Sequence, residues 1–585
     1  MSQATLFRKG ADPIGRLSVI FFVSFLSLIL SLFRMQVLRH DYYLGLSERN
    51  RLRVIYLEGP RGRILDRQGV ELAVNRLSFN CAVYPSEAKS TLHKSAQILS
   101  SLLKQGTPEE IEAAYRRKKP GIFNTVLLAE DISAAQAMAI EERLDSLPGF
   151  MIQTRPQREY PLGESAAHLV GFIGPINDEE EESLEPYGYR SADWLGRDGV
   201  EKSYESYVRG HSGGFQIEIN SRGKMIRPLG IKEPKDGRDL TLTLDAQLQN
   251  SFQNLLKGQR GAILVMELKE GGMLAMNSSP SFDPNLFASS PGRKQVGHYL
   301  VDSQSPMMNR GLHGRYPPGS IFKVVTALAA LESGKMTPST SVNCSGALVL
   351  GRTIFHCWKE TGHGPQVLTE AFAHSCNVFF YRAGMSAGID FLMERAGKLG
   401  LGQLTGIDLP GESKGLVPSK EWKRKNFKQA WYNGETANFS IGQGYLQVTP
   451  LQALVMIAAI ATDGQRLRPH VVDKIGGFKV AEKHATALGI AAGDLSAVKA
   501  GMDAVVNSET GTGRLARPSK VRAAGKTGTA QSGQDRTHAW FVGYAPSDQP
   551  KVAVVVFLEN GGRGGVAAAS MAKVIFDRLD EKSYL

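Results

Sequence analysis

An uncharged stretch of 17 residues, LSVIFFVSFLSLILSLF, occupies positions 17–33 of the chain. A helix needs roughly 17–25 apolar residues to cross a bilayer, so this stretch predicts one membrane-spanning helix. The residues that follow it contain no small-residue cleavage site, which favours an uncleaved anchor over a secretory signal peptide. The chain is therefore expected to fold on one side of a membrane, tethered at its N-terminus.

Basic residues on both sides of this stretch bear on its orientation. Arg8, Lys9 and Arg16 favour a cytoplasmic N-terminal tail, although basic residues after the stretch weaken the difference. We expect residues 1–40 to form a short tail and a single-pass anchor in the inner membrane. The rest of the chain would then lie in the periplasm, an oxidising compartment.

The length and charge of the chain narrow the choice of domains and partners. With 585 residues it is too long for a single core. Its formal net charge of +12 suits an acidic polymer or an anionic membrane surface. The basic residues are scattered and no nucleic-acid-binding motif accompanies them, so nucleic acid is not an expected partner.

Hydrophobic patterns divide the chain after the anchor into two regions. Residues 41–235, called the pedestal below, begin with short apolar alternations between Gly and Pro turns, which predicts an elongated β-rich module. Within it, residues 86–147 have helical patterns, and Thr107 is a candidate N-cap. Residues 236–585, called the catalytic region below, form the second expected domain.

The catalytic region begins and ends with strand patterns. Residues 261–276 predict two strands joined by a Gly-Gly turn, and long helical patterns follow. Two further strand-like runs, at 538–546 and 551–561, come before a final helix. Strands, then helices, then strands predict an α+β domain with an antiparallel sheet flanked by helices.

A serine and a lysine stand three residues apart in YPPGSIFKVVTALAAL. Helical periodicity begins directly after the Pro-Pro-Gly turn, so Ser320 and Lys323 fall on one face of the first helical turn. A lysine in this position can deprotonate the serine hydroxyl if a desolvated site lowers the lysine pKa. The pair alone is a weak signal, because the same spacing occurs elsewhere in the chain.

Two further elements make the pattern specific. Ser375 and Asn377 form an S-x-N motif, and Lys526, Thr527 and Gly528 form K-T-G, with Thr529 directly after it. The order S-x-x-K, S-x-N, K-T-G within one region is characteristic of serine acyl-transfer enzymes that bind penicillin.

With these motifs the chain resembles the class B penicillin-binding proteins, whose catalytic domain has a serine β-lactamase-like fold. RGRILDRQG at 61–69, GRDGVEKSYESYVRG at 196–210 and IGQGYLQVTPLQ at 441–452 extend the resemblance. GHG at 362–364 and LTGIDLPGESKGLVPSKEWK at 404–423 are similar to the elongation subgroup, the penicillin-binding protein 2 type. The resemblance covers nearly the whole chain after residue 50.

The resemblance implies roles for the first two motifs. Ser320 would attack the carbonyl of a D-Ala-D-Ala stem peptide, and Lys323 would act as its general base. Ser375 and Asn377 would relay a proton and orient the peptide amide. An acceptor amine would then resolve the acyl-enzyme, giving a peptidoglycan cross-link, and β-lactams would acylate the same serine.

It also implies roles for the third motif. Lys526 and Thr527 would hold the carboxylate end of the donor peptide. The backbone N–H groups of Ser320 and Thr529 would form the oxyanion hole. Gly528 would allow the substrate backbone to lie against the edge strand.

Other activities compete with this interpretation. A septal class B transpeptidase shares all three motifs, and a D-Ala-D-Ala carboxypeptidase has the same chemistry. A β-lactamase or β-lactam sensor is disfavoured by the anchor and the pedestal, and a non-enzymatic scaffold by the intact motifs. The resemblance implies as partners a polytopic glycosyltransferase of the shape, elongation, division and sporulation (SEDS) class and scaffold proteins of the elongation complex.

Three of the four cysteines lie between the first motif and the end of the second. With His363 they form the pattern C-x12-C-x5-H-x12-C, in which the cysteines are Cys344, Cys357 and Cys376. Three thiolates and an imidazole make a complete tetrahedral zinc set with no open position, which predicts a structural site. A Cys344–Cys357 disulfide and three unrelated core cysteines are the alternatives.

The resemblance adds weight to zinc. Some members of the elongation subgroup carry a structural zinc in this region, bound by the GHG histidine and a cysteine inside the second motif. They have aspartates where this chain has Cys344 and Cys357, so those two ligands depart from the family pattern. His356 and His374 are neighbouring alternatives to His363, and Cys81 is expected in a core.

Overall fold

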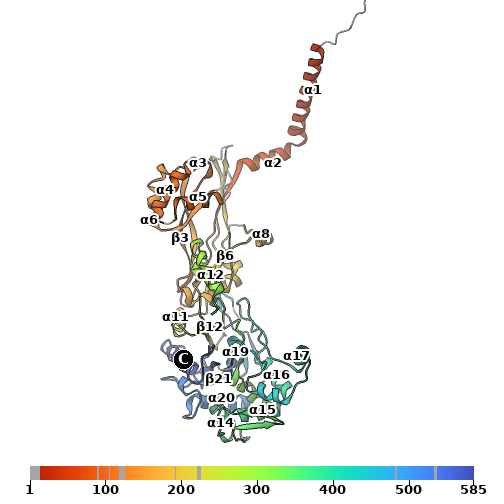
Figure 1. The fold of residues 1–585 in the computed structure, drawn as a ribbon, viewed down its shortest axis with the longest axis vertical. Helices are drawn as coiled ribbons and strands as arrows, with labels where there is room; N and C mark the ends of the chain where they lie inside the picture. The colour runs from red at the N-terminus through yellow and green to blue at the C-terminus, as the bar shows by residue number, and fades with distance from the viewer. Residues whose placement is uncertain are drawn as a thin grey trace, which may run out of the picture.

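The computed structural model describes residues 13–88, 91–104, 106–117, 125–190, 193–219, 225–480, 484–532 and 536–585. The molecule is elongated, with helix α1 (Pro13–Phe33) at one end, the pedestal in the middle and the catalytic region at the other end (Figure 1). Together with a π-helical turn, Arg34–Leu38, α1 gives an apolar helical span that buries none of its surface against protein. This exposure fits the predicted single membrane anchor. Arg8 and Lys9, which favour a cytoplasmic tail, lie outside the described residues.

Two sheets make up most of the strand structure described in the pedestal. β1 (Leu52–Leu57), β8 (Gly213–Ile219) and β9 (Met225–Lys232) make one antiparallel sheet. The other is built on the long strand β3 (Glu71–Val83), which pairs with β5 (Phe150–Glu159). The long paired strands explain the extended shape of this region.

Helices cover one end of β3. The predicted helical stretch contains α4 (Leu92–Leu103), α5 (Pro108–Arg117) and α6 (Ala134–Glu141). Thr107 caps α5 as predicted, since its hydroxyl accepts from the Glu110 backbone N–H at 3.3 Å. The helical prediction is wrong for β4 (Val126–Ile132), which pairs with β3 and closes a small separate core.

The sheet that contains β3 continues from the pedestal into the catalytic region and mixes parallel with antiparallel pairs. β2 (Ile64–Leu65), from the pedestal, pairs with β3 on one side and with β10 (Leu240–Leu242) on the other. β10 in turn pairs with β18 (Val472–Ile475), which comes late in the catalytic region. Strands from both sides of residue 235 therefore share one hydrogen-bonded sheet.

A buried ion network lies beside this junction. Glu201 accepts from Arg61 Nη2 at 2.6 Å and from Arg158 Nε at 2.7 Å, and the side chains of Arg158 and Glu201 are fully buried. Removing one partner of such a network leaves buried charge without compensation.

Replacing Glu201 by alanine is therefore expected to destabilise the protein by about 3–5 kcal/mol. The change would be measured as the shift in the urea unfolding midpoint of the full-length protein. Glu71→Ala is the matched control, because the Glu71 side chain is half exposed and lies 3.9 Å from Arg63. Equal midpoints for the two variants would contradict the prediction.

The catalytic region is built on an antiparallel five-stranded sheet. Its strand order is β12 (Met273–Ser279), β11 (Gly261–Glu267), β23 (Val552–Leu558), β22 (Thr537–Ala545) and β21 (Ala524–Gln531). The first two strands come from the beginning of the region and the last three from its end, as the sequence predicts. β21 lies at an edge of the sheet.

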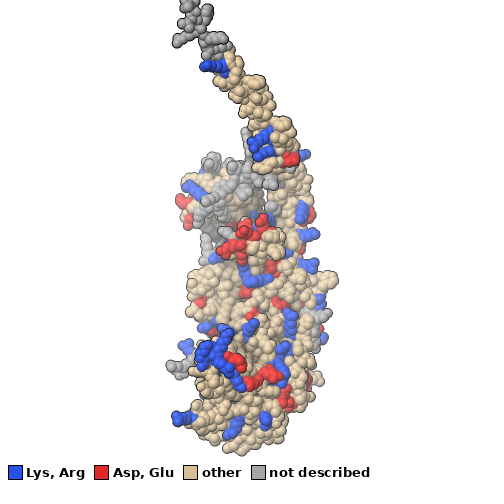
Figure 2. Space-filling model, turned by 90° about the vertical axis from the view of Figure 1, so that its right-hand side faces the viewer, with Lys and Arg blue, Asp and Glu red and all other residues tan. Residues whose placement is uncertain are grey.

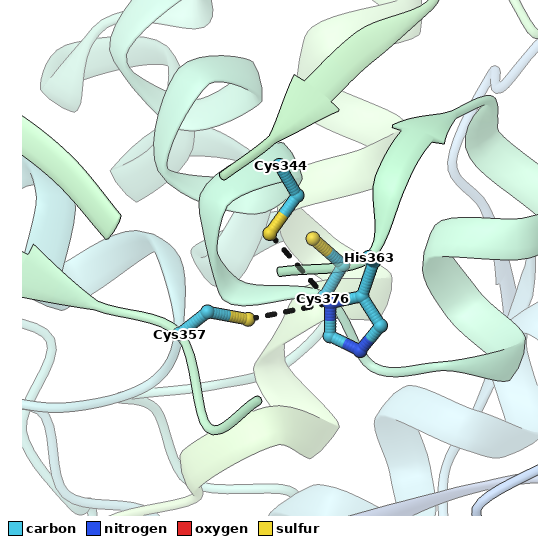
Figure 3. A group of neighbouring side chains, drawn as sticks. All are labelled: Cys344, Cys357, His363 and Cys376. Carbon is cyan, nitrogen blue, oxygen red and sulfur yellow. Dashed lines mark hydrogen bonds between the residues drawn. The ribbon is translucent and has the colours of Figure 1, made fainter. Parts of the chain in front are cut away.

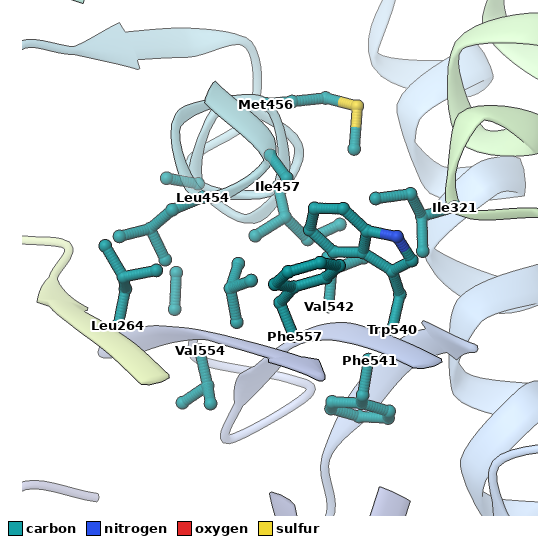
Figure 4. Close-up of a cluster of buried hydrophobic side chains, with 14 of the residues drawn as sticks. Leu264, Ile321, Leu454, Met456, Ile457, Trp540, Phe541, Val542, Val554 and Phe557 are labelled. Atoms are coloured by element: carbon teal, nitrogen blue, oxygen red, sulfur yellow. The ribbon is translucent and has the colours of Figure 1, made fainter. Parts of the chain in front are cut away.

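Helices cover both faces of this sheet, which confirms the α+β prediction. Trp540 and Phe557 lie on the same face as α19 (Pro450–Ala461), with ring centroids 4.4 Å apart (Figure 4). Phe541 points to the opposite face, where the centroid of its ring lies 6.2 Å from that of Phe576 in α21 (Ala567–Glu581). Alternation along β22 thus directs its side chains into two helical layers, one on each face of the sheet.

Candidate active site and metal-binding cluster

Ser320 lies in a single turn of 3-10 helix, Gly319–Phe322, which leads directly into α13 (Lys323–Glu332). Gly319 has φ +56°, and a Cβ there would lie 2.9 Å from the carbonyl oxygen of Thr529. Only glycine lets this turn approach β21 so closely. The residues of a 3-10 turn three apart eclipse one another, so Ser320 and Lys323 share a face as predicted.

The second motif forms the turn between α14 (Leu368–Ala373) and α15 (Asn377–Ala387). Ser375 is buried with φ +52°, a left-handed conformation that is unfavourable for serine. This backbone conformation is maintained by the surrounding contacts, and it places Ser375 and Asn377 against Lys323.

Two buried lysines converge on this turn. Lys323 Nζ donates to the Ser375 carbonyl at 2.8 Å, to Ser375 Oγ at 3.2 Å and to Asn377 Oδ1 at 2.7 Å. Lys526 Nζ donates to the same Ser375 Oγ at 2.9 Å. The structure thus brings the three motifs together, with the Ser375 hydroxyl between two lysine amino groups.

Burial lowers the pKa of both lysines. Desolvation lowers the pKa of Lys323 to about 8, although the nearby thiols of Cys357 and Cys376 act in the opposite direction. Desolvation also lowers the pKa of Lys526 well below its usual value, and the proximity of Lys323 lowers it further. A lysine with a pKa near 8 is partly neutral at physiological pH and can accept a proton.

Gly528 lies where β21 passes the serine-bearing turn. A Cβ at this position would lie 3.0 Å from both the carbonyl oxygen of Pro318 and the Ile321 side chain. The close neighbour of Gly528 is therefore the turn that holds Ser320. This contact gives a further reason for glycine at this position. The predicted reason was space for the substrate backbone.

Residues of all three motifs lie in or beneath the lining of a cavity of about 730 Å³. Ser320, Ser375, Asn377, Thr527 and Thr529 all face it, whereas Lys323 and Lys526 lie beneath them, fully buried. Several other lining residues were not identified from the sequence: His356, Trp358, Tyr381, Asn438, Gln443, Gly444, Thr512 and Arg563.

Thr512 shows why these residues are hard to find. Its hydroxyl accepts from the Thr527 hydroxyl at 3.1 Å, so it lies beside the third motif. In the sequence it is marked only by its flanking glycines, Gly511 and Gly513, a pattern common to many turns.

The four predicted metal ligands form a single cluster (Figure 3). The ligand atoms of Cys344, Cys357, His363 and Cys376 all lie within 4.8 Å of one another. Nδ1 of His363 is 3.6 Å from Sγ of Cys344 and 3.5 Å from Sγ of Cys357. A tetrahedral zinc with Zn–S near 2.3 Å and Zn–N near 2.0 Å would separate sulfur and nitrogen by about 3.5 Å. The observed spacing fits that geometry.

The cluster can also be compared with the alternatives to a zinc site, namely a disulfide and other histidine ligands. All four cysteines of the chain are free and buried, so the structure contains no Cys344–Cys357 disulfide. Both ring nitrogens of His374 have other partners, Gln366 at 2.7 Å and Thr510 at 3.1 Å. His363 is thus the histidine of the cluster.

The remaining cysteine, Cys81, lies in the core of the pedestal, as expected. Burial raises the pKa of its thiol to about 12.

A contact between two thiols of the cluster shifts the pKa values of both. A hydrogen bond from Cys376, with backbone N–H groups of residues 359, 377 and 378, lowers the pKa of Cys357 to about 4. The same contact raises the pKa of Cys376. The cluster therefore already favours one thiolate, the form of cysteine that binds metal.

Comparisons with known proteins agree with this geometry. Residues 261–577 match the family described as "Penicillin binding protein transpeptidase domain", and residues 56–242 match "Penicillin-binding Protein dimerisation domain". The chain belongs to the class B penicillin-binding proteins.

Its relatives are similar over most of their length. It is 35% identical to "Peptidoglycan D,D-transpeptidase MrdA" of Acinetobacter baumannii, covering 93% of this chain and 84% of the relative. Identity with the protein of the same name from Escherichia coli K12 is 33%, covering 94% and 91%.

Solved structures of penicillin-binding proteins have the same fold. The complex of penicillin-binding protein 2 and MreC from Helicobacter pylori matches with a TM-score of 0.81 and 29% identity, covering 91% of this chain and 99% of the matched chain. Pseudomonas aeruginosa PBP2 in complex with WCK 5153 matches with a TM-score of 0.69 and 32% identity, covering 90% and 96%. A chain of a peptidoglycan synthase complex that coordinates polymerization and crosslinking matches with a TM-score of 0.74 and 32% identity, covering 97% and 98%.

Proposed function

We propose that Ser320 is the nucleophile with which this penicillin-binding protein cross-links peptidoglycan during cell elongation and so maintains rod shape. The protein is a serine-type peptidoglycan D,D-transpeptidase of the elongation type. The observation that supports Ser320 is its position in one cavity with Ser375, Asn377, Thr527 and Thr529, above two buried lysines.

The first step requires that Lys323 be neutral. Its protonated form has three N–H donors, and all three are used by Ser375 and Asn377. When Lys323 loses a proton, one contact is released and a lone pair can take the proton of the Ser320 hydroxyl. Ser320 Oγ then bonds to the penultimate D-Ala carbonyl carbon, the peptide C–N bond breaks, and the terminal D-Ala leaves with a proton.

The other motif residues hold the donor peptide. Lys526 and Thr527 bind its terminal carboxylate, and the backbone N–H groups of Ser320 and Thr529 stabilise the oxyanion. Asn377 orients the scissile amide. An acceptor amine then attacks the acyl carbon, which restores the Ser320 hydroxyl and completes the cross-link. A β-lactam would stop after the first step.

The rate of acylation is expected to rise with pH through the pKa of Lys323, about 8. Because the neutral lysine is the active form, the second-order rate constant should increase tenfold per pH unit below 8 and level off above it. The measurement is the rate of labelling by a fluorescent penicillin between pH 6 and 10. A rate that falls across this range, or does not change, would argue against Lys323 as the base.

We propose that Cys344, Cys357, His363 and Cys376 bind a structural zinc ion. Support comes from the donor set, its burial and the sulfur–nitrogen distances of 3.5 and 3.6 Å. The ion would add no chemistry to the reaction, but it would hold the turn of the second motif through Cys376.

We also propose the membrane arrangement and the domain limits. Residues 1–40 form a cytoplasmic tail and inner-membrane anchor, residues 41–235 a periplasmic docking module, and residues 236–585 the transpeptidase domain. As partners we propose a polytopic SEDS-class glycosyltransferase and elongation-complex scaffold proteins. The complexes recorded for structural relatives, one with MreC and one in a peptidoglycan synthase, support these partners.

Two experiments test the proposal. The full-length protein, reconstituted with a SEDS-class glycosyltransferase and lipid-linked substrate, should release D-Ala and form cross-linked peptide dimers. Release of D-Ala without dimers would indicate a carboxypeptidase. In cells, a tagged copy should localise along the lateral wall, and exclusive localisation at midcell would indicate the septal alternative.

A further inference from the structure

We propose that a surface beside the active-site cavity binds the anionic stem peptides of a peptidoglycan strand while the strand is being cross-linked. This α17 surface consists of Arg424, Lys425, Phe427, Lys428 and Tyr432, on and just after helix α17 (Lys420–Phe427). The inference rests on the proposed function, because it places a part of the same polymeric substrate that lies outside the cavity.

Positive charge is concentrated on this surface. Arg424, Lys425 and Lys428 are exposed, and no acidic side chain in the part of the chain that the structure describes lies within ion-pair distance of them. The other two lysines of the helix are paired, Lys420 with Asp390 and Lys423 with Glu435. Figure 2 shows a group of basic side chains on this face, at the level where Figure 1 places α17.

Aromatic rings hold the charged helix in place and reach its surface. The rings of Trp422, Phe427 and Tyr445 contact one another, with centroids 5.0–5.5 Å apart. Nevertheless Phe427 is 46% exposed, and Tyr432 is 60% exposed. Exposed aromatic rings beside unpaired cations are more typical of a binding surface than of a merely solvated helix.

One short segment of the chain, residues 443–445, links the cavity to the α17 surface. Gln443 and Gly444 line the cavity together with Ser320, and the next residue, Tyr445, belongs to the aromatic cluster of α17. The backbone N–H of Gln443 donates to the Asn438 carbonyl at 3.0 Å, which ties this segment to another cavity-lining residue. A chain leaving the cavity past Gln443 would therefore meet α17.

The positive charge of the α17 surface and its link to the cavity indicate which ligand it binds. Stem peptides carry free carboxylates, which an arginine fork and lysine ammonium groups bind by charge-assisted hydrogen bonds. A strand bears many such peptides, so one can occupy the cavity while a neighbouring peptide contacts Arg424, Lys425 and Lys428. A β-lactam is too small to reach both places, so only the polymeric substrate depends on the α17 surface.

The test uses the full-length protein in detergent with the substitutions Arg424→Gln, Lys425→Gln and Lys428→Gln combined. The probes are uncross-linked peptidoglycan strands with stem peptides, and the same strands after an amidase has removed the peptides. The triple variant should bind peptide-bearing strands about tenfold more weakly at low salt, and its labelling by fluorescent penicillin should match wild type. The matched control combines Lys257→Gln, Lys335→Gln and Lys551→Gln, three exposed lysines that do not line the cavity.

Three outcomes would overturn the inference: unchanged strand binding by the triple variant, an equal loss in the control, or an equal loss with peptide-free strands. The last would mean that the surface binds the glycan and not the peptides. Failure of wild-type protein to react with penicillin would instead count against the proposed function, so the two failures can be told apart.

Discussion

Ser320→Ala is expected to abolish covalent labelling of the protein by a fluorescent penicillin. In the proposed reaction the hydroxyl of Ser320 bonds to the acyl carbon, and the other hydroxyl-bearing motif residues of the same cavity have supporting roles. We expect the acylation rate to fall by about four orders of magnitude or more, below detection in a gel assay.

The fold should survive this change. Ser320 lies at the surface of the cavity, so losing its hydroxyl creates no buried unpaired group. The thermal unfolding midpoint should therefore stay within about 2 °C of wild type. Ser570→Ala, at an exposed position of α21, is the matched control and should label normally. Labelling of the Ser320→Ala protein at the wild-type rate would refute the assignment of the nucleophile.

Removing one metal ligand is expected to have the second largest effect. Wild-type protein, purified under reducing conditions, should contain one zinc ion per chain by mass spectrometry. Cys376→Ser should lose that ion and unfold at a lower temperature, because a structural zinc contributes directly to folding. Acylation should also slow by about tenfold to a hundredfold, because Cys376 separates Ser375 and Asn377 and even a 1 Å displacement of catalytic groups is costly.

Cys81→Ser separates the loss of metal from the cost of a polar group in a core. Cys81 is fully buried in the pedestal, far from the cluster in sequence and outside its ligand set. This variant should lose stability and keep both its zinc and its acylation rate. Metal-free wild-type protein that contains a Cys344–Cys357 disulfide would refute the zinc proposal.

Patterns confined to a few neighbouring residues were predicted well from the sequence. The strands of the catalytic sheet, the caps and the three motifs each depend on local periodicity or spacing. The clustering of three cysteines with His363 was also predicted, because cysteine is rare in this chain and each one could be considered individually.

Features that depend on distant partners were missed. β4 has a sequence compatible with a helix, and only pairing with β3 makes it a strand. The sequence does not show that Gly528 packs against the turn of Ser320, about 200 residues earlier, and its predicted substrate contact stays a prediction. Thr512 lines the cavity because of the way the chain folds back, and its local sequence gives no sign of it. Gln443 belongs to IGQGYLQVTPLQ, which carries the family resemblance, but that stretch does not indicate a place in the cavity.

The mixed sheet at the base of the pedestal has a geometric consequence for wall synthesis. Since β2, β10 and β18 hydrogen-bond across the border between the two regions, the catalytic region cannot swing freely on a linker. The distance between the first pedestal strand, β1, and Ser320 is then fixed, and the long strands β3 and β5 account for much of the extended shape between them. Ser320 therefore keeps one position relative to the pedestal while strands are joined.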